Sequence, residues 1–130
     1  QLNTRTENHY SSLVMLVWTD HSGLIFQTYD NFNWDISEET KMSNSTPDSQ
    51  KGRWIDIRYE VDVYPNQKGK LKIYADNKMI YERYQHPTIK NGGSVSLKLG
   101  IYNYRVSEMK EPRTSQYVYY DDINKKVTSY

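Results

Sequence analysis

One eleven-residue stretch, Trp54–Tyr64 (WIDIRYEVDVY), alternates apolar and polar side chains without a break. After the leading tryptophan, its odd-numbered positions are apolar or aromatic, and its even-numbered positions from Asp56 to Asp62 are charged. Side chains alternate between the two faces of a β-strand, so this pattern gives one apolar face and one charged face. A helix would spread the same apolar residues around its whole circumference. The stretch therefore predicts a strand with one face against a core.

The same two-residue period recurs along the chain, and no segment has a convincing helical period. Turn-forming residues at 20–23, 76–78 and 91–93 separate the alternating segments and predict hairpins at the first two places. Residues 37–52 are polar and contain Pro47 and Gly52, which predicts a loop. The other predicted strands are Ser12–Trp18, Leu24–Asp30, Lys70–Asp76, Met79–Tyr84, Ser94–Arg105 and Tyr117–Ile123. About seven strands with frequent turns predict an all-β sandwich or jelly roll.

The size and charge of the chain limit its partners. Of its 130 residues 36% are hydrophobic, which fits one domain over residues 1–130 with one modest core. The 17 basic and 16 acidic residues are interspersed and give a net charge of +1, so no global field attracts nucleic acid or an anionic membrane. The longest apolar run, Leu13–Trp18, is too short to cross a bilayer. We expect a soluble chain that has neither nucleic acid nor a membrane as its partner.

Several common catalytic motifs do not occur in the sequence. It has no phosphate-binding loop, dinucleotide-binding fingerprint, His-Glu-x-x-His pair or Gly-x-Ser-x-Gly elbow. The three histidines, His9, His21 and His86, lack the spacing of a transition-metal site. The absence of cysteine excludes disulfides and thiolate chemistry. We therefore expect chemistry that requires no nucleotide, no transition metal and no other cofactor.

The predicted strand Ser94–Arg105 (SVSLKLGIYNYR) has an unusual open face. Its apolar residues share one parity, whereas Lys98, Gly100, Tyr102 and Tyr104 share the other. The glycine leaves room for a ligand to approach the sheet, and the column is about 20 Å long at about 3.3 Å per residue. Tyrosine rings stack on flat ligands such as sugars, and the chain has 13 tyrosines against two phenylalanines. The pattern indicates a track for a polymer; the alternative is a solvated face on which tyrosine is only a good strand former.

Three segments of the chain resemble strands of a known enzyme family. LKLGIYNYR resembles the Phe-Lys-Ala-Gly-x-Tyr-x-Gln strand of alginate-lyase-like polysaccharide lyases and the Lys-x-Gly-x-Tyr-Arg strand of heparin and glucuronan lyases. RWIDIRYEVDVYPNQKGKLKIYADNKMIYE resembles the family's Trp-led strand and hairpin, and YVYYDDI resembles its closing strand. The resemblance covers residues 53–123, with the pieces in the family's order. It implies a concanavalin A-like jelly roll that cleaves an acidic, uronic-acid-containing polysaccharide by β-elimination.

The resemblance also implies roles for residues of the open face. Lys98 would contact the substrate, Tyr104 would line the groove, and Tyr102 would be the catalytic tyrosine, as base and acid or as acid alone. The reaction needs a cation or amide to neutralise the C5 carboxylate, a base for the α-proton and an acid for the departing O4. A free tyrosine has a pKa near 10, so as a base it needs a cationic or hydrogen-bonding neighbour. The candidate neighbours are Lys98, Arg105 and Arg58.

Two further residues of the family's site have less direct counterparts. Thr4-Arg5-Thr6-Glu7 resembles the family's Arg-Ser-Glu segment, which implies a catalytic role for Arg5; the alternative is an exposed terminal charge. The family also uses a histidine, but this chain has no Gln-x-His triplet. His21 is nearest in order, although it lies in a predicted turn where a polar residue needs no catalytic role, and His9 is a weaker substitute.

Family members have further strands before the Arg-Ser-Glu segment. We therefore expect that the chain is the C-terminal part of a longer one, is a shortened form, or completes its sandwich with another chain, because an open sheet edge invites pairing. Asp121 and Asp122 in the predicted closing strand are candidate ligands of a structural Ca²⁺. The alternative for this pair is two solvated charges at the end of a strand.

Two other functions fit the same pattern. A non-catalytic carbohydrate-binding or lectin-like jelly roll would bind sugar on the same face without cleaving it. An assembly domain of a phage or a cell surface would merely share the sandwich. The resemblance favours the lyase, with an acidic polysaccharide as its partner and a secreted or extracellular location.

Overall fold

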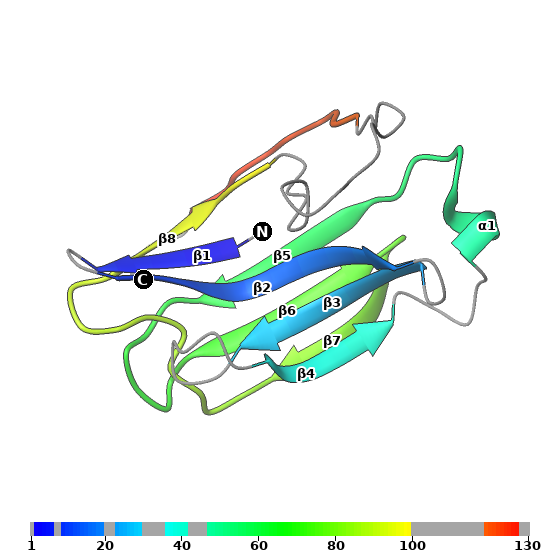
Figure 1. Cartoon of the computed structure of the whole chain (residues 1–130). Helices are drawn as coiled ribbons and strands as arrows, with labels where there is room; N and C mark the ends of the chain where they lie inside the picture. The colour runs from blue at the N-terminus through cyan, green and yellow to red at the C-terminus, as the bar shows by residue number, and fades with distance from the viewer. Residues whose placement is uncertain are drawn as a thin grey trace, which may run out of the picture. The chain divides into compact units, whose positions relative to one another are not determined.

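Eight strands and one short helix make up the regular structure of the residues that the computed structural model describes, which are 2–6, 9–19, 23–29, 36–41, 47–99 and 119–127. The strands form two antiparallel sheets, which confirms the all-β fold predicted from the alternation (Figure 1). The chain divides into two units, residues 1–98 and 99–130, and these eight strands all lie in the first. One domain over residues 1–130 stays a prediction.

The larger sheet has five strands in the order β4-β3-β2-β1-β8, and each neighbouring pair is antiparallel. Its strands are β1 (Leu2–Thr6), β2 (His9–Thr19), β3 (Gly23–Tyr29), β4 (Ile36–Lys41) and β8 (Ser94–Leu97). The pairing of β2 with β3 confirms the hairpin predicted around residues 20–23. β8 comes from much later in the chain and pairs with β1.

A β-bulge in β2 explains why two successive residues, Leu13 and Val14, are both buried. The register with β1 pairs Asn3 with Ser12 but Leu2 with Val14, which leaves Leu13 as the extra residue. The bulge shifts the alternation by one residue. Both side chains can therefore belong to the same core cluster.

The smaller sheet has three strands in the order β5-β6-β7, which are β5 (Ile57–Asp62), β6 (Lys70–Ala75) and β7 (Lys78–Arg83). β6 and β7 form a hairpin through Asp76 and Asn77, whose φ angles of 49° and 62° lie in the left-handed region. Aspartate and asparagine tolerate this region better than other non-glycine residues, which suits them to such turns. The hairpin predicted around residues 76–78 is confirmed, and the strand predicted over Trp54–Tyr64 is shorter than expected.

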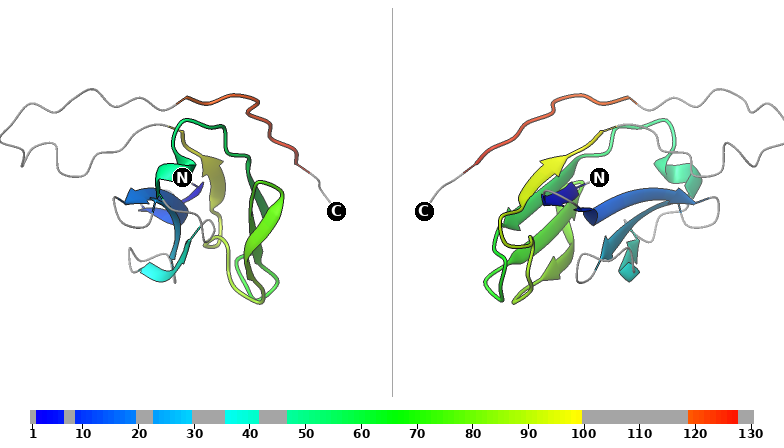
Figure 2. Two further views of the ribbon diagram at one scale, coloured as in Figure 1. Left: turned by 90° about the vertical axis from the view of Figure 1, so that its right-hand side faces the viewer. Right: turned by 60° about the vertical axis from the view of Figure 1, so that its left-hand side comes forward.

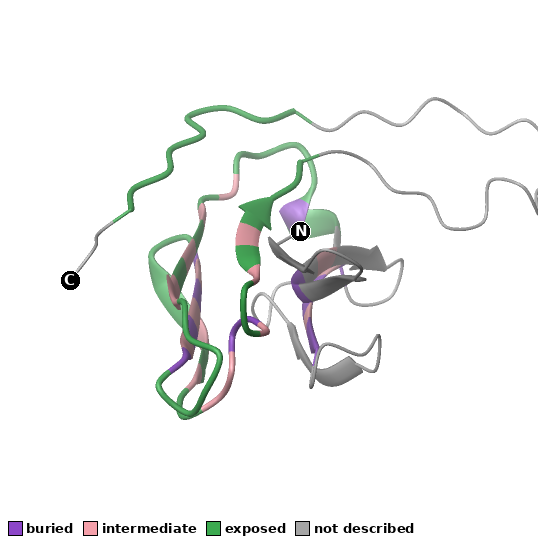
Figure 3. Cartoon of the chain, turned by 90° about the vertical axis from the view of Figure 1, so that its left-hand side faces the viewer, coloured by how far each residue is buried: buried purple, intermediate pink, exposed green. Residues whose placement is uncertain are grey.

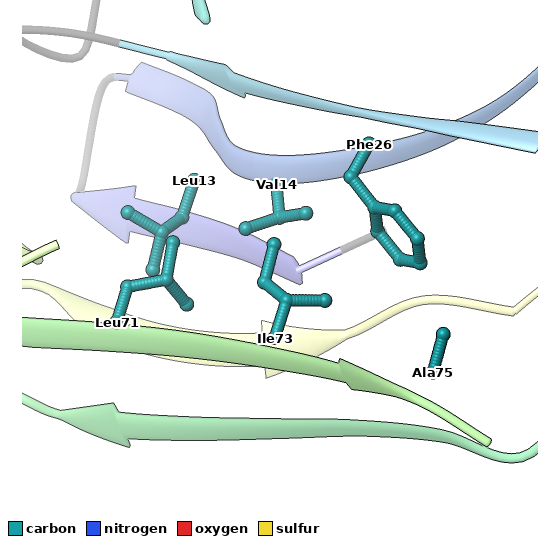
Figure 4. Close-up of a cluster of buried hydrophobic side chains, with 6 residues drawn as sticks. All are labelled: Leu13, Val14, Phe26, Leu71, Ile73 and Ala75. Atoms are coloured by element: carbon teal, nitrogen blue, oxygen red, sulfur yellow. The ribbon is translucent and has the colours of Figure 1, made fainter. Parts of the chain in front are cut away.

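The two sheets pack face to face around an apolar core, and Figure 2 shows them facing each other. The core cluster takes Leu13, Val14 and Phe26 from the larger sheet and Leu71, Ile73 and Ala75 from the smaller one (Figure 4). Phe26 also meets the ring of Tyr59 edge to face, with 6.3 Å between ring centroids. The β5 side predicted to face the core does pack against it from Ile55 to Val61. Val63, beyond the end of β5, is exposed instead.

The buried side chain of Thr88 connects the segment after β7 to the end of β5 through hydrogen bonds. Thr88 Oγ1 donates a hydrogen bond to the Asp62 carbonyl oxygen at 2.7 Å and accepts one from the Tyr64 N–H at 2.9 Å. The His86 N–H donates to the Gly69 carbonyl oxygen at 3.3 Å, and a Cβ on Gly69 would overlap the carbonyl oxygen of His86. These contacts fix the route by which the chain leaves the smaller sheet before it reaches β8.

The loop predicted over residues 37–52 is wrong, because this range contains most of β4 and the helix α1 (Pro47–Gln50). β4 has the polar sequence ISEETK, but its ladder with β3 is made by backbone groups, which any side chain allows. Proline suits the first position of a helix because its fixed φ is helical and no N–H is needed there. Gln50 fixes α1 to β3, since its Oε1 accepts a hydrogen bond from the Leu24 N–H at 2.8 Å.

None of the helical structure described here is long and apolar enough to cross a membrane. The four-residue α1 instead covers one end of β3.

The predicted strand Ser94–Arg105 is also shorter in the structure. β8 ends at Leu97, and residues 100–118 lie outside the described residues. The sequence places Leu97 and Leu99 on the core side, but they are 42% and 45% exposed. Within β8, Val95 contacts the core cluster, and the strand ends two residues later. Leu97 and Leu99 therefore lie beyond the part of this segment that packs against the core.

The predicted closing strand Tyr117–Ile123 is not formed in its described part, because residues 119–127 carry no strand. The Asp122 N–H donates to Asp121 Oδ1 at 2.8 Å, and the φ of Asp122 is 49°. A left-handed residue interrupts the extended conformation of a strand.

Candidate functional site

The outward face of the larger sheet carries the described part of the predicted polymer track. In β8, Val95 packs against the core, so Ser94 and Ser96 on the other parity point outward, and both are exposed (Figure 3). Lys98 follows with the same parity and is also exposed. Because serine side chains are short, a long ligand can lie close to the backbone of β8 with a lysine at the end of its path.

β1 lies beside β8 and contains the predicted site residue Arg5. In the register Arg5 is opposite Ser94 and Leu2 is opposite Leu97, so Arg5 and Lys98 lie towards opposite ends of this ladder. The four-residue step from Ser94 to Lys98 corresponds to about 13 Å at about 3.3 Å per residue. This spacing suits two contacts along a polymer better than two contacts with one small group.

Two residues of β3 that the sequence analysis missed also face outward on the larger sheet. Phe26 is fully buried, and Thr28 Oγ1 lies 3.5 Å from the Tyr81 hydroxyl of the smaller sheet, so both point into the sandwich. Gln27 and Tyr29 therefore have the outward parity, and the Tyr29 hydroxyl donates a hydrogen bond to Gln27 Oε1 at 3.1 Å. This bond holds the amide in one orientation, and an amide nitrogen can donate hydrogen bonds to a carboxylate.

The burial of the β3 pair separates the roles of its two members. Tyr29 is 6% exposed, so its ring supports its neighbour rather than meeting a ligand. Gln27 is half-buried and is the more accessible member of the pair. The signal in the sequence is the segment Ile25-Phe26-Gln27-Thr28-Tyr29, in which an amide and a tyrosine share the parity opposite a phenylalanine.

Arg58 lies on the smaller sheet and not beside Lys98. Its neighbours Ile57 and Tyr59 pack against the core, so Arg58 faces outward on that sheet. Its guanidinium carbon lies 4.0 Å from the ring centroid of Tyr74, and its Nε lies 3.5 Å from Glu60 Oε1. The core separates this side chain from the outward face of the larger sheet. The structure therefore does not bring Arg58 and Lys98 together.

The remaining predicted residues of the active site lie outside the described residues. They are His21, Tyr102, Tyr104 and Arg105, and their roles stay predictions. His9 begins β2, where its register partner is Thr6. Of the predicted set, the structure thus puts Arg5 and Lys98 on neighbouring segments of one sheet, and it adds Gln27 from the same sheet.

The two candidate calcium ligands, Asp121 and Asp122, are exposed. The Asp121 carboxylate accepts a hydrogen bond from the Asp122 N–H, and Asn124 Nδ2 donates to the Asp122 carbonyl oxygen at 3.1 Å. Within the described ranges no group of three or more histidine, cysteine or acidic residues is arranged to hold a metal ion. Calcium takes about six to eight oxygen ligands, so two carboxylates alone do not make a site. Calcium binding here stays a prediction.

The described groups with shifted pKa values belong to the framework of the smaller sheet. Burial raises the pKa of the Tyr59 hydroxyl, so this tyrosine stays protonated and does not serve as a base. A hydrogen bond from Arg53 lowers the pKa of the Asp76 carboxyl. A hydrogen bond with Tyr84 raises the pKa of the Lys72 ammonium group. None of these three groups lies on the outward face of the larger sheet.

Comparison with protein families matches residues 3–124 of the chain to a family model described as polysaccharide lyase. The comparisons with curated proteins and with solved structures found no match. The matched range begins in β1, includes both sheets and ends in the segment after residue 119. The chain therefore belongs to the polysaccharide lyase family, and its activity is that of a polysaccharide lyase.

Proposed function

We propose that this lyase cleaves an acidic, uronic-acid-containing polysaccharide by β-elimination, with Tyr102 as the catalytic tyrosine. We also propose that the polymer binds along the outward face of the larger sheet. The pairing of β1 with β8 carries the proposal. It makes neighbours of two segments that are distant in sequence, the one that contains Arg5 and the one that leads into Lys98 and Tyr102. Both segments resemble substrate-binding or catalytic segments of the same enzyme family.

The first requirement of the reaction is to neutralise the C5 carboxylate, because its negative charge makes the C5 proton hard to remove. Lys98 supplies a positive charge for this carboxylate at the end of β8. The Gln27 amide lies on β3, about 14 Å from β8 across β2 and β1, and donates hydrogen bonds to the carboxylate of another sugar unit. Tyr29 positions the Gln27 amide through the bond to Oε1. Arg5, at the other end of the ladder, contacts a different sugar unit of the same polymer.

The second requirement is proton transfer. Tyr102, as the phenolate, takes the C5 proton, and the electron pair of that bond forms the C4–C5 double bond. The C4–O4 bond breaks as this double bond forms, and O4 leaves with the proton that Tyr102 returns to it. A nearby cation favours the phenolate, and Lys98 and Arg105 are the candidates within the same segment. The products are one chain with a new reducing end and one with an unsaturated uronate at its non-reducing end.

We also propose a secreted or extracellular location, because a polysaccharide too large to enter a cell meets the enzyme outside it.

The test follows the unsaturated uronate by its ultraviolet absorbance. The protein is incubated with alginate, glucuronan, heparin and hyaluronan, and with a neutral glucan as control. We expect the absorbance to rise with at least one acidic polymer and not with the neutral one. Chain cleavage that gives new reducing ends without this absorbance would contradict β-elimination. Binding to acidic polymers without any cleavage would favour a carbohydrate-binding module.

A further inference from the structure

The connection between α1 and β5 carries an exposed tryptophan. Trp54 is 65% exposed, whereas the next residue, Ile55, packs against the core. This alternation of burial continues into β5, which gives Trp54 the outward parity of the smaller sheet. The other outward positions of the stretch, from Asp56 to Asp62, are charged. The indole is therefore an exposed aromatic group beside a row of charged residues, and the fold itself does not bury it.

A network around Arg53 fixes the backbone that carries this indole. Arg53 Nε donates a hydrogen bond to the Ser49 carbonyl oxygen at 3.3 Å, and its Nη1 donates to the Trp54 carbonyl oxygen at 3.2 Å. Arg53 Nη2 lies 2.8 Å from Asp76 Oδ2 in the turn between β6 and β7. One arginine thus connects the segment of α1, the backbone of Trp54 and the hairpin turn.

Asp56 strengthens the same frame from the other side of the tryptophan. Its N–H donates to Asp76 Oδ1 at 3.2 Å, and its carbonyl oxygen accepts a hydrogen bond from the Asp76 N–H at 2.9 Å. The backbone is therefore tied to the hairpin both before and after Trp54. A flat ligand that stacks on the indole meets a surface whose backbone needs little further ordering, which lowers the entropic cost of binding.

The outward face next to Trp54 continues with groups that bind sugar hydroxyls. Arg58 lies four residues further on, about 13 Å along the strand, and its guanidinium stacks on Tyr74 at 4.0 Å. The Tyr74 hydroxyl donates a hydrogen bond to Glu60 Oε2 at 3.3 Å. Guanidinium groups donate to hydroxyls and carboxylates accept from them, while an indole presents a flat apolar surface to the C–H face of a sugar ring. This order of groups fits several sugar rings that lie along β5.

We propose that Trp54 is the stacking platform of a second polysaccharide-binding surface, on the outward face of the smaller sheet. The occupant is the polysaccharide that the enzyme cleaves, since the family match assigns a polymer substrate to this chain. The charges beside the indole have both signs, so the surface recognises sugar rings and hydroxyls rather than the charge of a uronate. A surface that holds the polymer away from the cleavage site raises its effective concentration there. This inference rests on the family match and not on the role of Tyr102.

The test measures retention of the protein in native gels that contain alginate, glucuronan, heparin, hyaluronan or a neutral glucan. Trp54→Ala is expected to weaken the apparent affinity for the polymer that retains the wild type about three- to tenfold, the scale of one aromatic stacking contact. Trp54→Phe keeps a smaller ring and is expected to lose less. Tyr119→Ala, which removes an exposed aromatic ring of the second unit, is the matched control and should leave retention unchanged.

Two further measurements separate this surface from the cleavage site and from folding. Trp54→Ala should leave the rate on a short oligosaccharide unchanged and reduce the rate on the polymer at low concentration. Its melting temperature should stay within a few degrees of the wild type, because the side chain is mostly in water. Ultraviolet absorbance measures cleavage, and gel retention measures polymer binding at Trp54. The proposed function and this inference can therefore fail independently. Equal retention of Trp54→Ala and wild type, or no retention of the wild type by any of these polymers, would overturn the proposal.

Discussion

The Tyr29 hydroxyl donates a hydrogen bond to Gln27 Oε1 at 3.1 Å on the outward face of β3. The donor is buried and the acceptor is half-buried, so the tyrosine fixes the position of an amide that is more accessible than the tyrosine itself. A carboxylate is a partner that an amide nitrogen binds well. The pair therefore offers a direct test of which face of the molecule meets the substrate.

Gln27→Ala is expected to reduce kcat/KM about tenfold or more, because a hydrogen bond to a charged group contributes about 1.5–3 kcal/mol. Tyr29→Phe keeps the ring and removes only the donor that orients the amide, so its loss should be smaller. Gln67→Ala, in the exposed turn before β6, is the matched control. Initial rates of unsaturated-product formation give the comparison. Equal rates for the Gln27 and Gln67 variants would remove the β3 pair from the site.

Tyr102→Phe is expected to abolish turnover while leaving polymer binding nearly intact. The ring remains available for stacking, so binding loses at most about one hydrogen bond, on the order of 0.5–1.5 kcal/mol. Loss of a group that moves a proton should slow the reaction roughly 10²- to 10⁴-fold. Tyr104→Phe is the control, with a milder effect if that residue only lines the groove. Near-normal production of unsaturated ends by Tyr102→Phe would show that another residue is catalytic.

The pair Arg53–Asp76 predicts a dependence of stability on pH. Arg53 lowers the pKa of the Asp76 carboxyl, and a carboxyl whose pKa is lower in the folded state stabilises that state when it is ionised. The contribution is complete above the ordinary carboxyl range near pH 4, and it is lost as the pH falls through the lowered folded pKa. Asp76→Asn should therefore lower the melting temperature slightly at about pH 7 and hardly at all at about pH 2.

The Asp76→Asn substitution keeps the turn intact, because asparagine tolerates the left-handed φ of 49° at position 76. Asp56→Asn is the control, since the hydrogen bonds of Asp56 to Asp76 are made by its backbone. Melting curves across the acid range give the two profiles. A difference between Asp76→Asn and wild type that has the same size at both ends of the range would contradict the ion pair as its cause.

Gly69→Ala is expected to destabilise the protein more than Gly92→Ala. A Cβ at position 69 would overlap the backbone carbonyl oxygen of His86, which cannot move without breaking the contacts of the segment around Thr88. At position 92 a Cβ meets open space, and the cost is only that of the left-handed φ of 72°, about 1–2 kcal/mol. Urea unfolding measures both. A larger loss of stability for Gly92→Ala than for Gly69→Ala would mean that the backbone contact between Gly69 and His86 does not hold the segment after β7 in place.

Ile73→Ala tests the core between the two sheets. Ile73 is fully buried in the cluster, and truncating such a side chain costs about 2–5 kcal/mol in the free energy of unfolding. Ile123→Ala, which shortens an exposed isoleucine, should change it by less than about 0.5 kcal/mol. Urea unfolding measures the free energy of unfolding of both variants. A small effect of Ile73→Ala would show that the sheets do not share one core.

The sequence predicted the hairpins and the buried face of β5, because the residue patterns that indicate them are local. Two-residue alternation decides which residues of a strand share a face, and Asp76 and Asn77 are residue types that tolerate the left-handed φ of a tight turn. β4 and α1 were missed because their residues are polar, and the hydrogen bonds that form them come from the backbone. The sequence identified only part of the candidate site. Lys98 and Arg5 were found by resemblance, whereas Gln27 was not found at all.

The sequence by itself determined that this chain is all-β, and it determined which residues of β5 share a face. Only the tertiary structure decided that β8 pairs with β1, which side of β3 meets the smaller sheet, and that Arg58 lies on the opposite side of the core from Lys98. The physical reason is that parity follows from the backbone of a single strand. The pairing of distant strands and the choice of the buried face depend on which apolar surfaces meet across the sandwich, and no local pattern contains that information.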